Sequence, residues 1–218
     1  MKKSFLIIGL GRFGIGVVKE LVSLKRDCLA IDKFEDAVKN VSQIMSNCAV
    51  ADGTKIEALR ELEVESVDHA IVAIGNNLQD TILTVINLRE LGVKQITVRI
   101  DSDDFKDVMF RLGATDVIIP EEASAISLAN QIISDTILDY YSVHDEYSIA
   151  TIVVGKNFEE ISLLNLASLK RFDINIIGIK RDDKFIQPKA NDLIKPGDIL
   201  TIFGPDKNIN KFDAFLNK

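Results

Sequence analysis

The sequence predicts an α/β protein, built from a doubly wound parallel sheet and a smaller C-terminal α+β domain. Over the first 120 residues, short apolar runs alternate with segments of helical spacing, which is the pattern of repeated β–α–β units. Three glycines, Gly9, Gly11 and Gly14, lie where the first apolar run meets the first helical segment. After Pro120 the pattern changes to a long helical stretch and then to short strands separated by turns. These observations predict two domains joined by a helix.

The first domain is expected at residues 1–120. Its strand-like apolar runs lie at 4–8, 28–31, 47–50, 70–74, 95–100 and 116–119. Between them, helical spacing predicts helices at 13–24, 35–41, 55–62, 79–91 and 104–112. Because crossovers between parallel strands are right-handed, these strands are enough for a complete Rossmann-like sheet with helices on both faces.

A long amphipathic helix is expected after the sheet, at 121–141. Its apolar residues have helical spacing and form a wide stripe. They are Ile126, Leu128, Ala129, Ile132, Ile133, Ile137 and Leu138. So wide a stripe predicts packing against another subunit or domain. The polar and aromatic residues at 140–147 predict a hinge, so that 121–147 is expected to be a crossover helix and hinge.

The second domain is expected at 148–218. Strand-like segments lie at 148–154, 175–180, 185–187 and 199–203, and helical segments at 161–169 and 206–216. The turn Lys195-Pro-Gly-Asp198 leads into the last of these strands. A domain of this size has a small core, so dimerisation is expected to stabilise it.

Composition excludes several classes of function. The net charge of −7 argues against a surface that binds nucleic acid. No apolar run approaches the roughly 18–20 residues that a membrane span needs, and the N-terminal residues do not resemble a signal peptide. Cys28 and Cys48 form no metal-binding or redox motif, so they are expected to be reduced thiols of a cytoplasmic protein.

The glycine pattern predicts a nucleotide site. Glycine allows the backbone to turn sharply and to approach a pyrophosphate, and the free N–H groups of the following helix then hold the anion. Asp32 ends the second apolar run, where a carboxylate can accept the hydroxyls of a ribose. The alternative is that the glycines serve only close packing between strand and helix.

The carboxyl ends of parallel strands meet at one edge of a sheet, so the residues after each strand should line one crevice. The candidate ligand-binding residues there are Gly9, Gly11, Arg12, Phe13, Gly14, Asp32, Lys33, Asp52, Gly53, Ala73, Gly75, Asn77, Arg99 and Glu121.

Several of these residues have two interpretations. Arg12 can fork onto phosphate oxygens or stay solvated. Asp52 can accept from an adenine amino group or cap a helix, and Asn77 can contact ligand or cap the next helix. Arg99 can reach a phosphate or form an internal ion pair. Glu121 can pair with an arginine, ligate a cation held by phosphates, or only favour a helix N-terminus.

No catalytic apparatus is evident. The glycine loop is followed by Ile15 and not by the lysine of a phosphate-binding NTPase loop, and no GxSxG is present. His69 and His144 have no Cys or His neighbours at metal-binding spacing. A nucleotide site without an acid, a base or a substrate domain favours a sensor over an enzyme, with a small NAD-dependent oxidoreductase as the less favoured alternative.

The motifs resemble those of the regulator-of-potassium-conductance domain (RCK, or KTN). The first domain is similar through Gly9-Leu-Gly-Arg-Phe-Gly14, Ala51-Asp-Gly-Thr54, Ala73-Ile-Gly-Asn-Asn77 and Ile119-Pro-Glu121. The second domain is similar through Asn175-Ile-Ile-Gly-Ile-Lys-Arg181, Ile186-Gln-Pro188 and Gly197-Asp-Ile-Leu-Thr-Ile-Phe-Gly204. One copy of each domain is the layout of KtrA/KtrC-like regulatory subunits of Ktr-type channels.

The resemblance implies a cytoplasmic homodimer that assembles into an octameric ring, at the inner face of the cell membrane, on a KtrB/KtrD-like potassium channel subunit. Exchange of ATP and ADP would gate the channel; NAD(H), as in Trk-type regulators, is the alternative ligand. The resemblance also implies that Arg12 reaches the terminal phosphate and that Asp32 holds the ribose. Asp52 would lie near the base, Arg99 near phosphate, and Glu121 near Mg²⁺ or another cation.

Two departures from the family pattern bear on ligands. Lys33 and Phe34 follow Asp32 where small or acidic residues are more usual, so selectivity at the ribose edge is open. Members that bind cyclic di-AMP are expected to have an arginine three residues before an aromatic residue and a glycine after it. Here Leu169, Phe172 and Asp173 occupy those positions. Cyclic di-AMP is therefore doubtful, and its contacts would be Asn175, Ile176 and Pro188.

Overall fold

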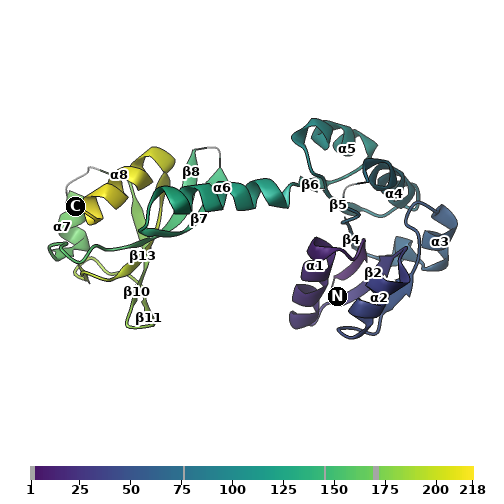
Figure 1. Ribbon diagram of the computed structural model, residues 1–218, viewed down its shortest axis with the longest axis horizontal. Helices are drawn as coiled ribbons and strands as arrows, with labels where there is room; N and C mark the ends of the chain where they lie inside the picture. The colour runs from purple at the N-terminus through teal and green to yellow at the C-terminus, as the bar shows by residue number, and fades with distance from the viewer. Residues whose placement is uncertain (1–2, 76, 145, 169–171) are drawn as a thin grey trace. The chain divides into compact units, whose positions relative to one another are not determined.

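The computed structural model describes residues 3–75, 77–144, 146–168 and 172–218. The chain divides into two compact units, Met1–Pro120 and Glu121–Lys218 (Figure 1). Each unit has its own sheet and its own apolar core. Within the described part of the chain, no helix combines the length and the hydropathy needed to cross a membrane.

The first unit contains a six-stranded parallel sheet. Its strands are β1 (Ser4–Ile8), β2 (Asp27–Asp32), β3 (Cys48–Val50), β4 (His69–Val72), β5 (Gln95–Arg99) and β6 (Asp116–Ile118). They lie in the order β3-β2-β1-β4-β5-β6, which reverses direction at β1. Leu6 at the middle of β1 lies opposite Leu29 of β2 and Ala70 of β4. The predicted Rossmann-like fold is confirmed.

Helices cover both faces of this sheet. They are α1 (Arg12–Ser23), α2 (Glu35–Ser42), α3 (Ile56–Glu61), α4 (Leu78–Glu90) and α5 (Lys106–Leu112), with 3₁₀ turns at Val64–Ser66 and Asp103–Phe105. On one face, Ile7 and Ala30 pack with Val18 of α1 and Val38 of α2. On the other face, Leu6 and Ile8 pack in a larger core that includes side chains of α3, α4 and α5. Apolar residues thus point to both faces of the strands, as expected for a buried parallel sheet.

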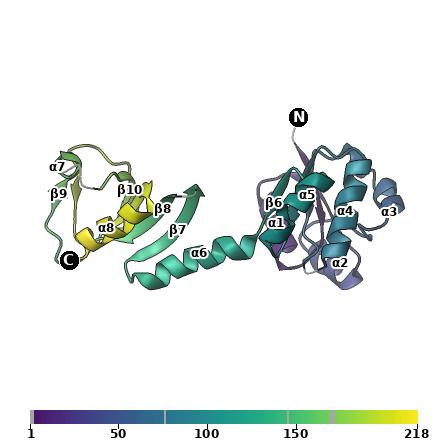
Figure 2. The same cartoon turned by 90° about the horizontal axis from the view of Figure 1, so that it is seen from above.

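The second unit is an α+β structure. Its elements are α6 (Pro120–Ile133), β7 (Ile137–His144), β8 (Tyr147–Val153), β9 (Ile161–Ser162), α7 (Leu163–Ser168), β10 (Asn175–Arg181), β11 (Lys184–Ile186), β12 (Leu193–Ile194), β13 (Ile199–Pro205) and α8 (Asp206–Leu216). Five strands form an antiparallel sheet in the order β11-β10-β13-β8-β7. Helix α8 lies against this sheet (Figure 2). Its residues Ile209, Phe212 and Leu216 belong to the apolar core of the unit.

The prediction of one helix through Tyr141 is wrong beyond Ile133. Helix α6 ends there, and Ile137–His144 forms strand β7, which pairs with β8 as a hairpin in place of the expected hinge. The cause is a turn between helix and strand. Ser134 and Thr136 donate their hydroxyls to the two oxygens of Asp213, at 2.7 and 2.6 Å. Side-chain bonds of this kind compete with helix continuation.

An ion pair between a buried carboxylate and a partly exposed guanidinium fixes the turn before β13. Asp198 is 1% exposed, and its carboxylate accepts hydrogen bonds from Nε and Nη2 of Arg181 at 2.6 and 2.7 Å. The backbone N–H of Lys195 donates a further bond to Asp198 at 2.8 Å. The Asp198 hydrogen bonds and nearby carboxylates raise the pKa of Arg181. The turn Lys195–Asp198 therefore has a structural role.

Candidate functional site

The candidate site lies at the carboxyl edge of the parallel sheet. Gly9 follows β1, Asp32 ends β2, Asp52 follows β3, Ala73 follows β4 and Arg99 ends β5. Because all six strands are parallel, these residues lie along one edge. The strand order reverses at β1, between β2 and β4, which is where open α/β sheets form their ligand crevice.

The three glycines of the loop have different roles. A Cβ on Gly14 would lie 1.9 Å from the carbonyl oxygen of Gly9, and one on Gly9 would lie 2.6 Å from the backbone of Ala73. Gly9 also has a φ of 97°, which other residues rarely adopt. Both are thus required for close packing. Nothing lies within 4 Å of a Cβ built on Gly11, so only Gly11 faces open space.

The N-terminus of α1 is built to accept an anion. Its first three N–H groups have no partners within the helix, its cap residue Gly11 offers no side-chain cap, and its first turn carries no acid. Arg12 is exposed at the first helical position, whereas Phe13 is half-buried and packs with the core under α1 and α2. The helix dipole and the Arg12 guanidinium therefore add positive potential at the same point.

Asp32 connects the end of β2 to the glycine loop. Its Oδ2 accepts a hydrogen bond from the N–H of Leu10 at 2.7 Å, and its Oδ1 accepts one from the N–H of Phe34 at 2.9 Å. These bonds fix the orientation of the carboxylate. Each carboxylate oxygen has a further lone pair, so Asp32 can still accept hydroxyl groups of a ribose.

Lys33 and Asp52 lie beside Asp32 and make contacts within the protein. The Nζ of Lys33 lies 2.8 Å from Oδ2 of Asp80, in the first turn of α4. Oδ1 of Asp52 accepts hydrogen bonds from the N–H and the hydroxyl of Thr54 at 3.0 and 2.8 Å. Burial opposes ionisation of Asp52, but these bonds and nearby lysines outweigh it, so its pKa is lowered. Asp52 forms a turn and does not cap α3, which begins after Lys55.

The residues after β4 and at the end of β5 lie close together. Gly75 has a φ of 77°, and a Cβ on it would lie 3.5 Å from Nη1 of Arg99. Arg99 is 13% exposed and its Nη2 lies 3.0 Å from Asp101, so the internal ion pair is present. Asn77 caps α4, since its side chain accepts from the N–H of Asp80 at 3.0 Å. Ligand contacts of these residues stay predictions.

Two further candidates are explained by packing. A Cβ on Gly53 would lie 2.9 Å from a methyl group of Ile8, and the Gly53 carbonyl accepts a hydrogen bond from Asn87 at 3.2 Å. Ala73 is 4% exposed and lies against Gly9. These contacts fix the backbone that follows β3 and β4.

The remaining candidates lie in the second unit. Glu121 is in the first turn of α6, and its contact with phosphate or a cation stays a prediction. No group of three or more His, Cys, Asp or Glu side chains among the described residues is arranged to hold a metal ion. Asn175 is exposed and Ile176 is half-buried on β10, and Pro188 lies between β11 and β12. Cyclic di-AMP at these residues stays a prediction, and Leu169 lies outside the described residues.

Three residues near the carboxyl edge of the parallel sheet were not predicted from the sequence. Leu10 supplies the N–H that holds Asp32, Asp80 pairs with Lys33, and the buried hydroxyl of Thr84 lies close to Gly53 without a hydrogen-bond partner. An acid shortly after Asn77 fits a helix N-terminus, but its partner lies 47 residues earlier. No sequence pattern could have paired them.

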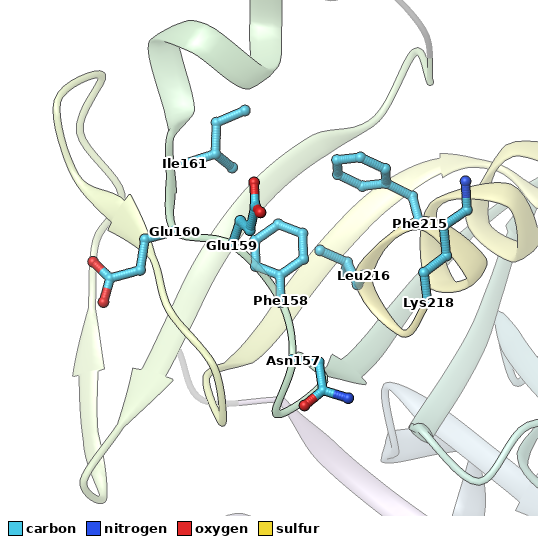
Figure 3. Close-up of a pocket in the computed structure, with 8 residues that line it drawn as sticks. All are labelled: Asn157, Phe158, Glu159, Glu160, Ile161, Phe215, Leu216 and Lys218. Atoms are coloured by element: carbon cyan, nitrogen blue, oxygen red, sulfur yellow. The ribbon is translucent and has the colours of Figure 1, made fainter.

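A separate cavity of about 340 Å³ lies in the second unit (Figure 3). Residues 157–161 form one wall, and Phe215, Leu216 and Lys218 of the chain end form the other. The ring of Phe158 meets that of Phe215 edge to face, with 5.6 Å between centroids. None of the predicted ligand-binding residues lines this cavity.

Comparison with known proteins gives matches over nearly the whole chain. A family model described as the TrkA-N domain matches residues 5–120, and one described as the TrkA-C domain matches residues 148–217. The "Ktr system potassium uptake protein C" of Bacillus subtilis is 37% identical over 98% of this chain and 97% of its own length. The "Ktr system potassium uptake protein A" of Vibrio alginolyticus is 32% identical over 97% of both.

Solved structures support the fold. The "Crystal Structure of the GsuK RCK domain" superposes on the whole of this chain with a TM-score of 0.67 and 15% identity, and the match covers 48% of that chain. Other GsuK structures include one "bound to NAD" (TM-score 0.67, 14% identity, 40% of that chain) and one "bound to ADP" (TM-score 0.52, 23% identity, 34% of that chain). The latter match spans 60% of this chain.

A Rossmann-like sheet with a glycine loop, followed by an antiparallel-sheet domain of the TrkA-C type, defines a protein of the RCK class. Within that class, the chain is 31–37% identical to Ktr system potassium uptake proteins over nearly its full length, and this identity decides the family. The chain belongs to the family of Ktr-type RCK regulatory subunits.

Proposed function

We propose that this chain is the nucleotide-sensing regulatory subunit of a potassium uptake channel. The observation that carries the proposal is the N-terminus of α1, where Gly11 leaves open space and the first turn has no acid. Such a terminus binds phosphate through backbone N–H groups. The relatives named as Ktr potassium uptake proteins supply the biological setting.

The ligand that we propose is an adenine nucleotide, ATP or ADP. Arg12 would contact the terminal phosphate, Asp32 the ribose, and Asp52 and Gly75 the base and its surroundings. Arg99 and Glu121 would complete the phosphate end, with Glu121 near a bound Mg²⁺. NAD(H) is the second candidate, because one GsuK structure is bound to NAD. Another GsuK structure is bound to ADP, which agrees with the first candidate.

We further propose a homodimer that assembles into an octameric ring beside a membrane-embedded potassium channel subunit, at the cytoplasmic face of the membrane. Exposed apolar side chains of α6 support an interface, since Ile132 and Ile133 are 74% and 78% exposed and no residue of α6 is buried. ATP must favour one ring conformation over the other, because a ligand with equal affinity for two states shifts neither. The role is regulatory and not enzymatic.

The test is calorimetric titration of the purified protein with ATP, ADP and NADH, combined with solution scattering. We expect tighter binding of ATP or ADP than of NADH, and different scattering profiles with ATP and with ADP. Equal affinities for all three ligands and unchanged scattering would contradict gating. NADH binding tighter than that of both nucleotides would favour a Trk-type regulator. Turnover of NADH with a carbonyl substrate would favour the oxidoreductase.

A further inference from the structure

The ion pair between Lys33 and Asp80 crosses from the end of β2 to the first turn of α4. Its N–O distance is 2.8 Å, and the Asp80 side chain is 19% exposed. The Lys33 ammonium also lies 5.4 Å from the ring centroid of Phe34. The Asp80 end is fixed, because Asn77 caps the turn that carries Asp80. The Lys33 side chain is 40% exposed, so Asp80 is the group that positions an ammonium otherwise open to solvent.

The charges around Lys33 are mostly negative. The hydrogen bond to Asp80, and then the charges of Asp80, Asp52 and Asp32, raise the pKa of the Lys33 ammonium. Lys55 acts on Asp52, so three carboxylates face two ammonium groups at this end of the crevice. The N-terminus of α1 and Arg12 are positive where phosphates are proposed, whereas carboxylates outnumber ammonium groups around Lys33, where the ribose is proposed.

A phosphate on the ribose 2′-oxygen would meet this negative end. Proteins that accept a 2′-phosphate place a cationic side chain near the end of the second strand. Lys33 directly follows Asp32 and has the required charge, but its Nζ is already paired with Asp80. Whether the site accepts a 2′-phosphate thus depends on Asp80, which itself need not touch the ligand.

We propose that Asp80 determines the ribose specificity of the nucleotide site, because it holds Lys33 away from the 2′ position. The site then prefers a free 2′-hydroxyl, which can donate to Asp32, over a 2′-phosphate. The inference rests on the proposed nucleotide binding and names the part of the chain that sets its selectivity. Asp80 acts as a positioning residue, and Lys33 is the group that it positions.

The experiment compares Asp80→Asn with the unaltered protein. Affinities are measured by calorimetry for two ligand pairs that differ only at the 2′-oxygen, namely ADP with its 2′-phosphorylated derivative, and NADH with NADPH. The substitution keeps the shape of the side chain but removes the charge that holds Lys33, so that a 2′-phosphate can compete for the ammonium. The affinity ratio should shift about tenfold toward the 2′-phosphorylated ligand, as expected for one charge-assisted contact. The double variant Asp80→Asn with Lys33→Met should lose this gain.

A matched control is Asp36→Asn. Asp36 lies in the first turn of the adjacent helix α2, is exposed, and carries the same charge. It should leave the ratio unchanged, which separates the specific release of Lys33 from a general loss of negative charge. A gain in Asp36→Asn equal to that in Asp80→Asn would overturn the proposal, as would a gain that survives in the double variant.

Failure of the inference and failure of the proposed function give different results. An unaltered protein that binds none of the four ligands would contradict nucleotide binding itself, and the inference would fall with it. A protein that binds ADP or NADH, but whose ratio is the same with and without Asp80→Asn, would overturn only the role of Asp80. If Asp80→Asn weakened the binding of both ligands of a pair equally, Asp80 would have only a structural role, and its role in specificity would be overturned.

Discussion

The carboxylate of Asp32 accepts the N–H of Leu10 at 2.7 Å, so the acid at the end of β2 holds the glycine loop after β1. Its other oxygen accepts the N–H of Phe34, and the same side chain therefore fixes two loops. Replacement of Asp32 by alanine would disturb the loop as well as any ribose contact. A loss of affinity in this variant would therefore not separate a folding defect from a lost ribose contact. Residues whose effects on folding and on binding can be measured separately give clearer tests of the site.

The glycine loop allows such a separation. Gly14→Ala should destabilise the first unit by about 3 kcal/mol or more, because its Cβ would lie 1.9 Å from the carbonyl oxygen of Gly9. Gly11→Ala should cost less than about 1 kcal/mol, since its Cβ would meet nothing within 4 Å. However, Gly11→Ala should weaken ADP binding at least about tenfold, because the methyl group fills the space proposed for phosphate. Amide hydrogen exchange and calorimetry measure the two effects, and full ADP affinity in Gly11→Ala would exclude the loop as the phosphate site.

Arg12 is expected to distinguish ATP from ADP. The guanidinium is exposed beside the N-terminus of α1. If it contacts the terminal phosphate, Arg12→Ala should reduce affinity for ATP about tenfold more than affinity for ADP. Arg26→Ala is the control, because Arg26 is exposed in the turn after α1 and carries the same charge. Equal losses for both nucleotides in Arg12→Ala would place its contact elsewhere on the ligand.

The ion pair of Asp198 and Arg181 should dominate the stability of the second unit. Asp198→Ala removes the carboxylate that accepts from the Arg181 guanidinium and from the Lys195 N–H, and should cost about 2–3 kcal/mol, since Arg181 is 30% exposed and stays solvated. Asp183→Asn is the control. It breaks the exposed pair with Lys180, keeps a residue type that tolerates the φ of 59° at this position, and should cost less than about 1 kcal/mol.

Tyrosine fluorescence during urea unfolding measures these costs. The chain has no Trp, and its three Tyr residues, Tyr140, Tyr141 and Tyr147, lie in the second unit, so the signal reports this unit alone. Similar costs for the two variants would contradict a structural role for Asp198.

His69 should make the stability of the first unit depend on pH. Burial lowers the pKa of His69, Lys3 adds to this effect, and Asp116 opposes it. The folded state therefore resists a proton that the unfolded chain accepts below about pH 6.5. Stability should be complete above that pH and should fall as the pH drops below it.

Hydrogen exchange of β1 and β4 at pH 7.5 and at pH 5.5 measures this effect. His69→Gln should abolish the part of the pH dependence that lies near pH 6.5, while its amide can still bond to Thr97, which lies 2.8 Å from His69 Nε2. His144→Gln is the control, because His144 is the other histidine of the chain and is exposed. An unchanged pH profile in His69→Gln would exclude this histidine as the cause.

The parallel sheet could be predicted because its determinants are local. Each strand is a short apolar run bounded by polar residues or glycine, and the glycine loop marks the first β–α turn. The end of α6 could not be predicted in this way. It depends on hydrogen bonds from Ser134 and Thr136 to Asp213, which lies 79 and 77 residues further along the chain. Apolar spacing alone continues through Leu138, so the sequence pattern fits a longer helix.

The same limit applies to the candidate site. Motif spacing could place Gly11, Arg12 and Asp32 at one edge as candidates, because a β–α turn and an acid at the next strand end follow directly from the chain order. It could not reveal that Lys33 is paired with Asp80, or that Arg99 is paired with Asp101 and lies close to Gly75. These relationships come from the tertiary structure. They show which of the separate candidates contact one another.

Helix α6 has fourteen residues and no buried side chain. Helices of about 12–15 residues are only marginally stable in water without tertiary support. The order of this segment therefore depends on what covers its apolar face, and its helicity should rise with protein concentration. If the proposed assembly covers this face, the same fourteen residues would be stiffer in an assembled subunit than in a lone one.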